Sequence, residues 1–189
     1  MTTNLISDEY KKQLTLMHRK SFGSGAEISP EIAKLIESGQ VKSILDWGCG
    51  KGFLTTALRK KYPECIVYQY DPITFPNDLP DKVDLIISSD VLEHVEPKQL
   101  KPTLRDLYTR ATKYQYHYIA CHPAKKRLPD GRNAHLIIEE PSWWARKIKN
   151  LNKDFGCTNT YEHIEDKKIP NKYNIRVIKY VVVIKHEIQ

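Results

Sequence analysis

Residues 43–52 read SILDWGCGKG, in which an apolar run is followed by three glycines within five positions. The apolar residues predict a short buried strand over residues 41–47, and the glycines predict a tight turn. Residues 53–61 then place apolar side chains on one face, which predicts a helix. Glycine lets the backbone approach a ligand closely, and a helix N-terminus points unpaired N–H groups at it. The segment therefore predicts a strand, turn and helix with a ligand at the turn.

Strands and helices alternate beyond this unit. Further strands are predicted over residues 65–70, 83–88 and 114–121, with a helix over 97–112. This order is typical of βαβ units, so we expect an α/β fold with a mostly parallel sheet and helices on both faces. The β-branched run at 175–184 predicts a long last strand, paired with residues 158–164 as a reversed C-terminal hairpin.

The remaining segments complete one predicted domain over residues 1–189. Helices are expected over residues 8–19, from Ser29 to Gly39, and over 141–151, the last after a long loop at 122–140. No repeat or linker indicates a second domain. We expect residues 1–40 to form a helical cap and residues 41–121 a cofactor-binding core. Residues 122–189 are expected to form a substrate-side loop, helix and C-terminal hairpin.

The composition is that of a globular protein. The chain has 189 residues, 40% of them hydrophobic, and no apolar run approaches the ~20 residues of a membrane span. Asp8 and Glu9 oppose a signal peptide, and four scattered cysteines oppose a disulfide framework, so we expect a cytoplasmic protein. Residues 98–189 carry 19 basic and 9 acidic side chains, which indicates either an anionic partner or a solvated basic surface.

An acidic residue at the end of the second strand indicates the kind of ligand. Asp71 lies nineteen residues after Gly52, where a carboxylate can accept both hydroxyls of a ribose. The third glycine of a dinucleotide fingerprint is replaced by Phe53, and Asp46 precedes the turn. A carboxylate there opposes a pyrophosphate and suits a cation. S-adenosylmethionine fits, because it combines a ribose with a positively charged sulfur and has no phosphate.

Three motifs carry a family resemblance: LDWGCGKG at 45–52, YD at 70–71 and DLIISSDVLEHV at 84–95. They resemble the Rossmann-like (class I) S-adenosylmethionine-dependent methyltransferases, in particular small-molecule-type members with a Leu-Glu-His signature. The resemblance is close over residues 41–95 and holds in outline elsewhere. It implies seven strands with the last reversed, and S-adenosylmethionine bound across the carboxyl ends of the first strands. The implied cofactor-binding residues are Asp46, Trp47, Gly48, Cys49, Gly50, Gly52, Asp71, Pro72, Ser89, Asp90 and Val91.

One departure from the family concerns residues 72–82. Members of the family usually place a helix and a strand here, but these eleven residues contain Pro72, Pro76 and Pro80. We therefore expect the helix and strand to be shortened or missing, with the second strand near the sheet edge. The acid that contacts the adenine is then uncertain, and Asp78 is a candidate.

Three histidines are candidate catalytic bases for transfer to an amine, phenol or alcohol. His94 and His122 follow the predicted strands 83–88 and 114–121, and His135 lies in a polar loop. Each has a purely structural alternative. The expected substrate side comprises Arg132, Asn133, Trp143 and Trp144, with the tryptophans serving as an aromatic lid or as core anchors. The spacing of the histidines and cysteines matches no known metal motif, so no metal is expected.

The sequence thus favours a methyltransferase that acts on a small, anionic or aromatic acceptor. Its alternatives are an S-adenosylmethionine-binding regulatory protein, an RNA or nucleotide methyltransferase, and a nicotinamide-dependent oxidoreductase, the last opposed by Phe53 and Asp46. Duplex DNA is disfavoured, because SSDV at 88–91 replaces the motifs of the DNA enzymes. No membrane partner is expected, and residues 18–25 are predicted either to fold over the cofactor or to form an exposed connector.

Overall fold

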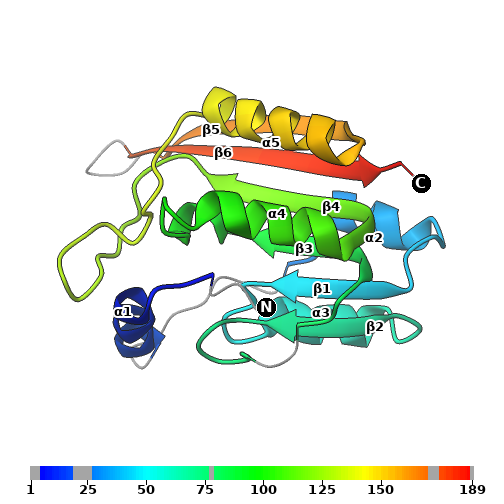
Figure 1. Ribbon diagram of the computed structural model, residues 1–189, viewed down its shortest axis with the longest axis horizontal. Helices are drawn as coiled ribbons and strands as arrows, with labels where there is room; N and C mark the ends of the chain where they lie inside the picture. Colours follow the sequence, from blue (N-terminus) through cyan, green and yellow to red (C-terminus); the bar gives the residue numbers. More distant parts are fainter. Residues whose placement is uncertain (1–4, 19–26, 77–78, 170–174, 188–189) are drawn as a thin grey trace.

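The computed structural model describes residues 5–18, 27–76, 79–169 and 175–187 (Figure 1). Its strands form one six-stranded sheet in the order β2-β1-β3-β4-β6-β5. The elements in chain order are α1 (Asp8–His18), α2 (Pro30–Glu37), β1 (Ser43–Trp47), α3 (Phe53–Lys61), β2 (Ile66–Tyr70), β3 (Val83–Ser89), the 3-10 turn η1 (Leu92–His94), α4 (Leu100–Arg110), β4 (Ala111–Ala120), α5 (Pro141–Phe155), β5 (Cys157–Ile169) and β6 (Ile175–His186).

The predicted α/β architecture is confirmed. β2, β1, β3 and β4 are parallel, whereas β6 runs antiparallel to both β4 and β5. Helices α4 and α5 cover one face of the sheet, and α2 and α3 cover the other (Figure 1). The expected helix over 97–112 ends earlier, because Ala111 already pairs with Val83 in the sheet. The C-terminal hairpin is longer than expected, since its pairing continues to Ile169 and Ile175.

The expected loss of a helix and strand after β2 is also confirmed. Residues 71–76 and 79–82, the described part of this connection, contain neither element, and β2 is an edge strand. A single bridge between Asp71 and Phe75 closes a turn directly after β2. The sheet has six strands in the described residues in place of the seven that the family resemblance implied. Asp78 lies outside the described residues.

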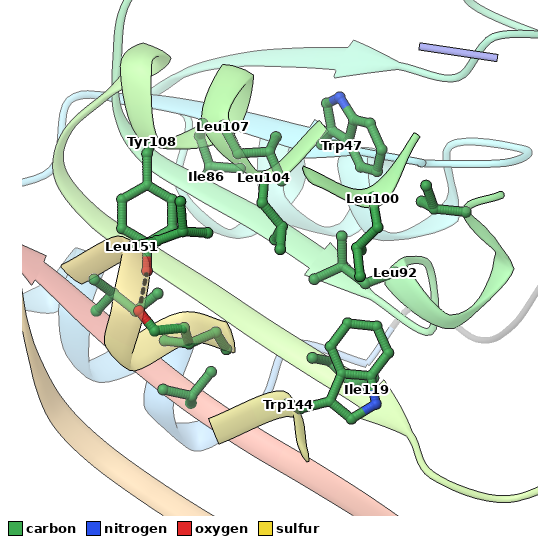
Figure 2. Packing of buried hydrophobic residues seen from close by; sticks show 14 of the residues in the cluster. Trp47, Ile86, Leu92, Leu100, Leu104, Leu107, Tyr108, Ile119, Trp144 and Leu151 are labelled. Carbon is green, nitrogen blue, oxygen red and sulfur yellow. Dashed lines mark hydrogen bonds between the residues drawn. The ribbon is translucent and has the colours of Figure 1, made fainter. Parts of the chain in front are cut away.

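The larger apolar core lies between the sheet and the helices α4 and α5. Trp144 and Tyr108 are among its largest fully buried side chains, and Leu104 and Ile119 pack in the same layer (Figure 2). The Tyr108 hydroxyl donates to the Asn152 side chain at 2.6 Å, which joins α4 to α5. This close packing against α4 and α5 positions β3 and β4, and with them the residues at their carboxyl ends.

Helix α1 and the loop over 122–140 both lie beyond the carboxyl ends of the parallel strands (Figure 1). The Asp130 backbone N–H donates to Gln13 Oε1 at 3.1 Å, which joins the loop to α1. Across the described residues, no helix is long and apolar enough to span a bilayer. The fold therefore gathers these irregular segments at the carboxyl ends of the parallel strands, where α/β proteins bind ligands.

Candidate active site

A pocket opens at the carboxyl ends of β1, β2 and β3. β2 and β3 flank β1 on opposite sides, because the chain passes from β1 to β2 on one side and then crosses to β3 on the other. This reversal of direction is the switch point at which open α/β sheets bind ligands. The lining residues are Leu5, Ile6, Tyr10, Leu14, His18, Trp47, Gly48, Tyr70, Asp71, Pro72, Asp90, Val91, His94, Val95 and Glu96.

The glycine turn after β1 forms the floor of this pocket. The backbone N–H groups of Gly48 and Cys49 donate to the Tyr70 carbonyl at 2.7 and 3.0 Å, which ties the turn to the end of β2. Gly48 has φ +79°, and a Cβ built on it would lie 2.3 Å from Val91 Cγ1. Only glycine fits here, because the turn must pass this close to the loop after β3.

Asp71 links the glycine turn to the connection after β2. Its side chain is buried, and its oxygens accept the backbone N–H groups of Gly50 at 3.2 Å, Ile73 at 2.9 Å and Thr74 at 3.0 Å. The carboxylate therefore shapes the turn as well as lining the pocket. Its predicted contact with a ribose stays a prediction.

The cofactor-binding residues expected from the sequence divide into two groups. Asp46 accepts a hydrogen bond from the Thr55 hydroxyl at 2.7 Å, on the side of α3, and burial raises its pKa to about 6. The expected cofactor-binding residues that line the pocket are Trp47, Gly48, Asp71, Pro72, Asp90 and Val91. The expected cofactor-binding residues that are not among its lining residues are Asp46, Cys49, Gly50, Gly52 and Ser89.

The N-terminal segment forms the roof of the pocket. Tyr10, Leu14 and His18 of α1 line it, and Tyr10 is almost fully buried. Glu96 fixes this roof, because its carboxylate accepts the Ser7 backbone N–H at 2.8 Å and the Ser7 hydroxyl at 2.7 Å. The sequence predicts that residues 18–25 either fold over the cofactor or form an exposed connector. His18 lines the pocket, and residues 19–25 lie outside the described residues, so this choice stays a prediction.

The three candidate histidines converge beside the pocket. The rings of His94 and His135 meet edge to face with centroids 4.8 Å apart, and His122 lies 5.7 Å from His135. His94 Nδ1 donates to the Ala134 carbonyl at 2.7 Å, and His135 Nδ1 donates to the His122 carbonyl. Burial lowers the pKa of His94 to about 4, so its imidazole is neutral at physiological pH. Of the three, His94 lines the pocket itself.

Glu93 is a site residue that sequence reasoning missed. Its side chain is 0% exposed, and its Oε1 accepts the Ala120 backbone N–H at 3.1 Å. Its Oε2 has no hydrogen-bond partner within the part of the chain that the structure describes. Burial, and then the charge of Asp90, raises the pKa of Glu93 to about 8. The sequence did contain a signal for this residue, because Glu93 is an acid directly before the candidate base His94 and close to the end of a predicted strand.

The charges around the pocket suit a cation. Its lining carboxylates are Asp71, Asp90 and Glu96, and the described residues that line it include neither lysine nor arginine. A phosphate would meet carboxylates without a counter-charge, whereas a sulfonium or ammonium group would be favoured. The apolar side chains of α1 complete a wall for a nucleoside.

The comparisons with known proteins agree with this geometry. The sequence profile of a methyltransferase domain family matches residues 17–164. The chain belongs to the class I methyltransferases. Its cofactor is therefore S-adenosylmethionine, and the carboxylate-lined pocket fits that cation. Whether the Leu-Glu-His segment acts as a subfamily signature stays a prediction.

Solved structures share the fold of this methyltransferase at low sequence identity. A Burkholderia thailandensis 1,6-didemethyltoxoflavin-N1-methyltransferase is 15% identical over 100% of this chain and 94% of its own, with TM-score 0.58. A Methanosarcina mazei S-adenosylmethionine-dependent methyltransferase is 12% identical over 86% and 100%, with TM-score 0.56. The Synechocystis PCC 6803 magnesium protoporphyrin IX methyltransferase is 14% identical over 99% and 86%, with TM-score 0.53. No curated protein matches the sequence.

The expected substrate-side residues lie apart from the pocket of the methyltransferase. Trp144 is fully buried, which agrees with the core-anchor alternative, and Trp143 lines a separate groove between α4 and α5. Arg132 is ion-paired with Asp130 at 2.6 Å on the surface. Asn133 holds the loop together, since its side chain accepts the Ala124 backbone N–H at 2.9 Å and donates to the Ala124 carbonyl at 3.0 Å. Roles for these residues toward a substrate stay predictions.

Proposed function

We propose that this methyltransferase acts on a small aromatic or anionic acceptor that enters the crevice on the His94 side. The observation that carries the proposal is the convergence of His94, His122 and His135 beside the cofactor pocket. They come from η1, from the end of β4 and from the loop that follows it. Such a cluster at the cofactor is where an acceptor atom needs a proton acceptor.

The chemistry divides between cofactor and chain. When bound, S-adenosylmethionine supplies an electrophilic methyl group on a positively charged sulfur. The apolar roof of α1 excludes water, and the neutral His94 imidazole accepts a hydrogen bond or a proton from the acceptor. Holding the acceptor in line with the methyl group supplies a further part of the rate enhancement.

Aromatic side chains in the pocket walls favour an aromatic acceptor, and the ammonium group of one lysine favours an anionic acceptor. Trp47, Tyr70 and Tyr10 line the pocket and offer ring surfaces for stacking. Near its His94 side, Lys179 Nζ lies 3.3 Å from an Asp90 carboxylate oxygen and 4.0 Å from the centre of the Tyr118 ring. A phenolate or carboxylate acceptor would thus compete with Asp90 for one ammonium group close to the reacting end.

The test combines calorimetry with labelled-methyl transfer. We expect micromolar binding of S-adenosylmethionine and of its demethylated product, lost in Asp71→Ala and unchanged in the exposed control Asp81→Ala. Labelled methyl groups should then enter a small-molecule extract and not total RNA. Silence from both ligands, or cofactor binding with no transfer to any acceptor, would contradict the proposal, and the second result would favour a regulatory protein.

An RNA or nucleotide acceptor is the second candidate, favoured by one observation. Helix α5 carries the exposed basic side chains Arg146, Lys147, Lys149 and Lys153. Contacts of this kind to phosphates weaken steeply with salt. Label that enters RNA, with transfer that falls sharply between low and physiological salt, would select this candidate.

A further inference from the structure

Glu93, His94 and His135 bring three metal-ligating side chains together beside the cofactor pocket. One ligand atom of each lies within 4.8 Å of the other two. Ligand atoms about 2.1 Å from a tetrahedral ion stand about 3.4 Å apart. The most widely separated pair therefore needs to close by up to about 1.4 Å, which side-chain rotations provide.

Backbone groups hold both imidazoles in the tautomer that a ligand needs. His94 Nδ1 donates to the Ala134 carbonyl at 2.7 Å, and His135 Nδ1 donates to the His122 carbonyl. In a neutral imidazole with the proton on Nδ1, the lone pair is on Nε2. Histidine ligands in proteins are held in this way, with the second nitrogen on a carbonyl or carboxylate.

The Glu93 carboxylate supplies an independent observation. Its Oε1 accepts the Ala120 backbone N–H, whereas Oε2 is buried without a partner among the described residues. A buried carboxylate oxygen without a partner is unfavourable. A bound cation would remove that cost, because it would satisfy Oε2 and leave the bond to Ala120 in place.

We propose that Glu93, His94 and His135 form a binding site for a divalent first-row transition-metal ion. Two imidazoles and one carboxylate suit such ions, whereas Mg²⁺ and Ca²⁺ prefer oxygen ligands alone. Lys179, whose charge acts on Glu93 and His135, is paired with Asp90 at 3.3 Å, which reduces its repulsion of an ion. Three protein ligands leave coordination positions for other molecules.

The site also narrows the class of acceptor, and this step rests on the proposed function. Because His94 lines the cofactor pocket, the ion lies next to the place where the acceptor meets the methyl group. With the ion bound, His94 Nε2 is a ligand, so the ion takes the place of His94 in activating the acceptor. A hydroxyl oxygen that binds the ion has a lowered pKa and releases its proton to water. The acceptor class is then a phenol, catechol or hydroxy acid, and the reacting atom is oxygen.

Cobalt(II) titration of the full chain tests the site without any turnover. The protein is treated with EDTA and titrated with Co²⁺ in the absence of acceptor, and visible absorption is followed. We expect one ion per chain, with affinity at least tenfold weaker in Glu93→Gln and in His135→Gln. His163→Gln, an exposed histidine of β5, is the matched control and should bind as the wild type does. Glutamine at position 93 keeps an oxygen for the Ala120 N–H.

The outcomes separate this site from the proposed function. Variants that lose cobalt and still bind S-adenosylmethionine are folded and support the site. Absence of a cobalt spectrum in the wild type, or unchanged affinity in both variants, overturns it. Cobalt binding without methyl transfer contradicts only the proposed function. Methyl transfer that is unaffected by EDTA overturns the role of the ion toward the acceptor.

Discussion

The pocket and the histidine cluster beside it form a crevice whose two ends differ in how their buried carboxylates are hydrogen-bonded. At the glycine end, formed by Gly48, Gly50 and Asp71, the buried carboxylate accepts three backbone N–H groups. At the histidine end, formed by Glu93, His94 and His135, a buried carboxylate accepts one, and its second oxygen has no partner among the described residues. The glycine end is satisfied by the chain itself, whereas the histidine end retains capacity for a ligand or a proton.

The difference shows how the carboxyl ends of one sheet can hold a cofactor at one end of the crevice and keep hydrogen-bonding capacity for a ligand at the other. The glycine end must present a fixed backbone shape to the cofactor, so its polar atoms are used to hold that shape. Under the proposed function, the histidine end changes its protonation or binds a partner during the reaction, which fits a Glu93 oxygen left without a partner among the described residues at a cost in stability. Substitutions at the two ends should therefore have different effects.

The largest effect is expected at the glycine end, from Gly48→Ala. The new Cβ would lie 2.3 Å from Val91 Cγ1, and φ at this position is +79°. We expect a loss of roughly 2–4 kcal/mol in the free energy of unfolding, with no cofactor binding by calorimetry. Gly39→Ala has a similar φ of +77° with nothing within 4 Å, and should lose only about 1 kcal/mol. If Val91→Ala does not restore part of the stability of Gly48→Ala, the steric explanation is wrong.

The next effect concerns His117, a buried histidine whose nitrogens are both satisfied. They lie 2.8 Å from Ser88 Oγ and 3.2 Å from Gln115 Oε1, and burial lowers the pKa of His117 to about 3. A pKa below that of the unfolded chain means that its contribution to stability is present above about pH 6.5 and lost as the pH falls. Denaturant unfolding at pH 7.5 and pH 5 should show roughly 2 kcal/mol less acid destabilisation in His117→Gln than in the wild type.

The matched control for this experiment is His163→Gln, because His163 is exposed on β5. Its acid destabilisation should equal that of the wild type. Equal pH dependence in His117→Gln and the wild type would show that His117 does not stay neutral in the fold. The contrast between satisfied and unsatisfied buried groups would then lose its support.

The smallest effect is expected where α1 is attached over the crevice. Glu96→Gln removes one charged acceptor from Ser7, so S-adenosylmethionine should bind about threefold to tenfold more weakly by calorimetry. The control Glu9→Gln alters an exposed carboxylate of α1 and should leave the affinity for S-adenosylmethionine unchanged. Equal affinity in all three proteins would mean that the roof does not contribute to cofactor binding.

Much of the glycine end was predictable from the sequence. The motif at 45–52 and the acid at position 71 depend on short-range chemistry, since glycine spacing sets the turn and the strand that follows sets where Asp71 lies. The missing elements after β2 were likewise predictable, because eleven residues with three prolines cannot form a helix and a strand. For residues 18–25 the sequence left a cover and an exposed connector open, and it did not show that Tyr10 would be buried above the pocket.

The histidine end could be predicted only as separate candidates. His94 and His135 are 41 positions apart, and they meet because the loop over 122–140 folds back on itself. That fold depends on the bridge between Arg127 and Asn133 and on the bonds of Asn133 to Ala124. No spacing rule anticipates such contacts, so sequence reasoning left Glu93 out, and its prediction of no metal stays a prediction that the proposed site opposes.

Local chain chemistry was therefore enough to predict an α/β fold with a glycine turn, an acid at the end of β2 and a shortened edge, and the resemblance of three motifs indicated the methyltransferase family. Backbone propensity and apolar periodicity act over a few residues, and a sequence displays them directly. The burial of Glu93, its unpaired oxygen and the three converging histidines arise from packing between segments far apart along the chain. Such packing depends on how whole elements meet, and only the folded molecule brings it into view.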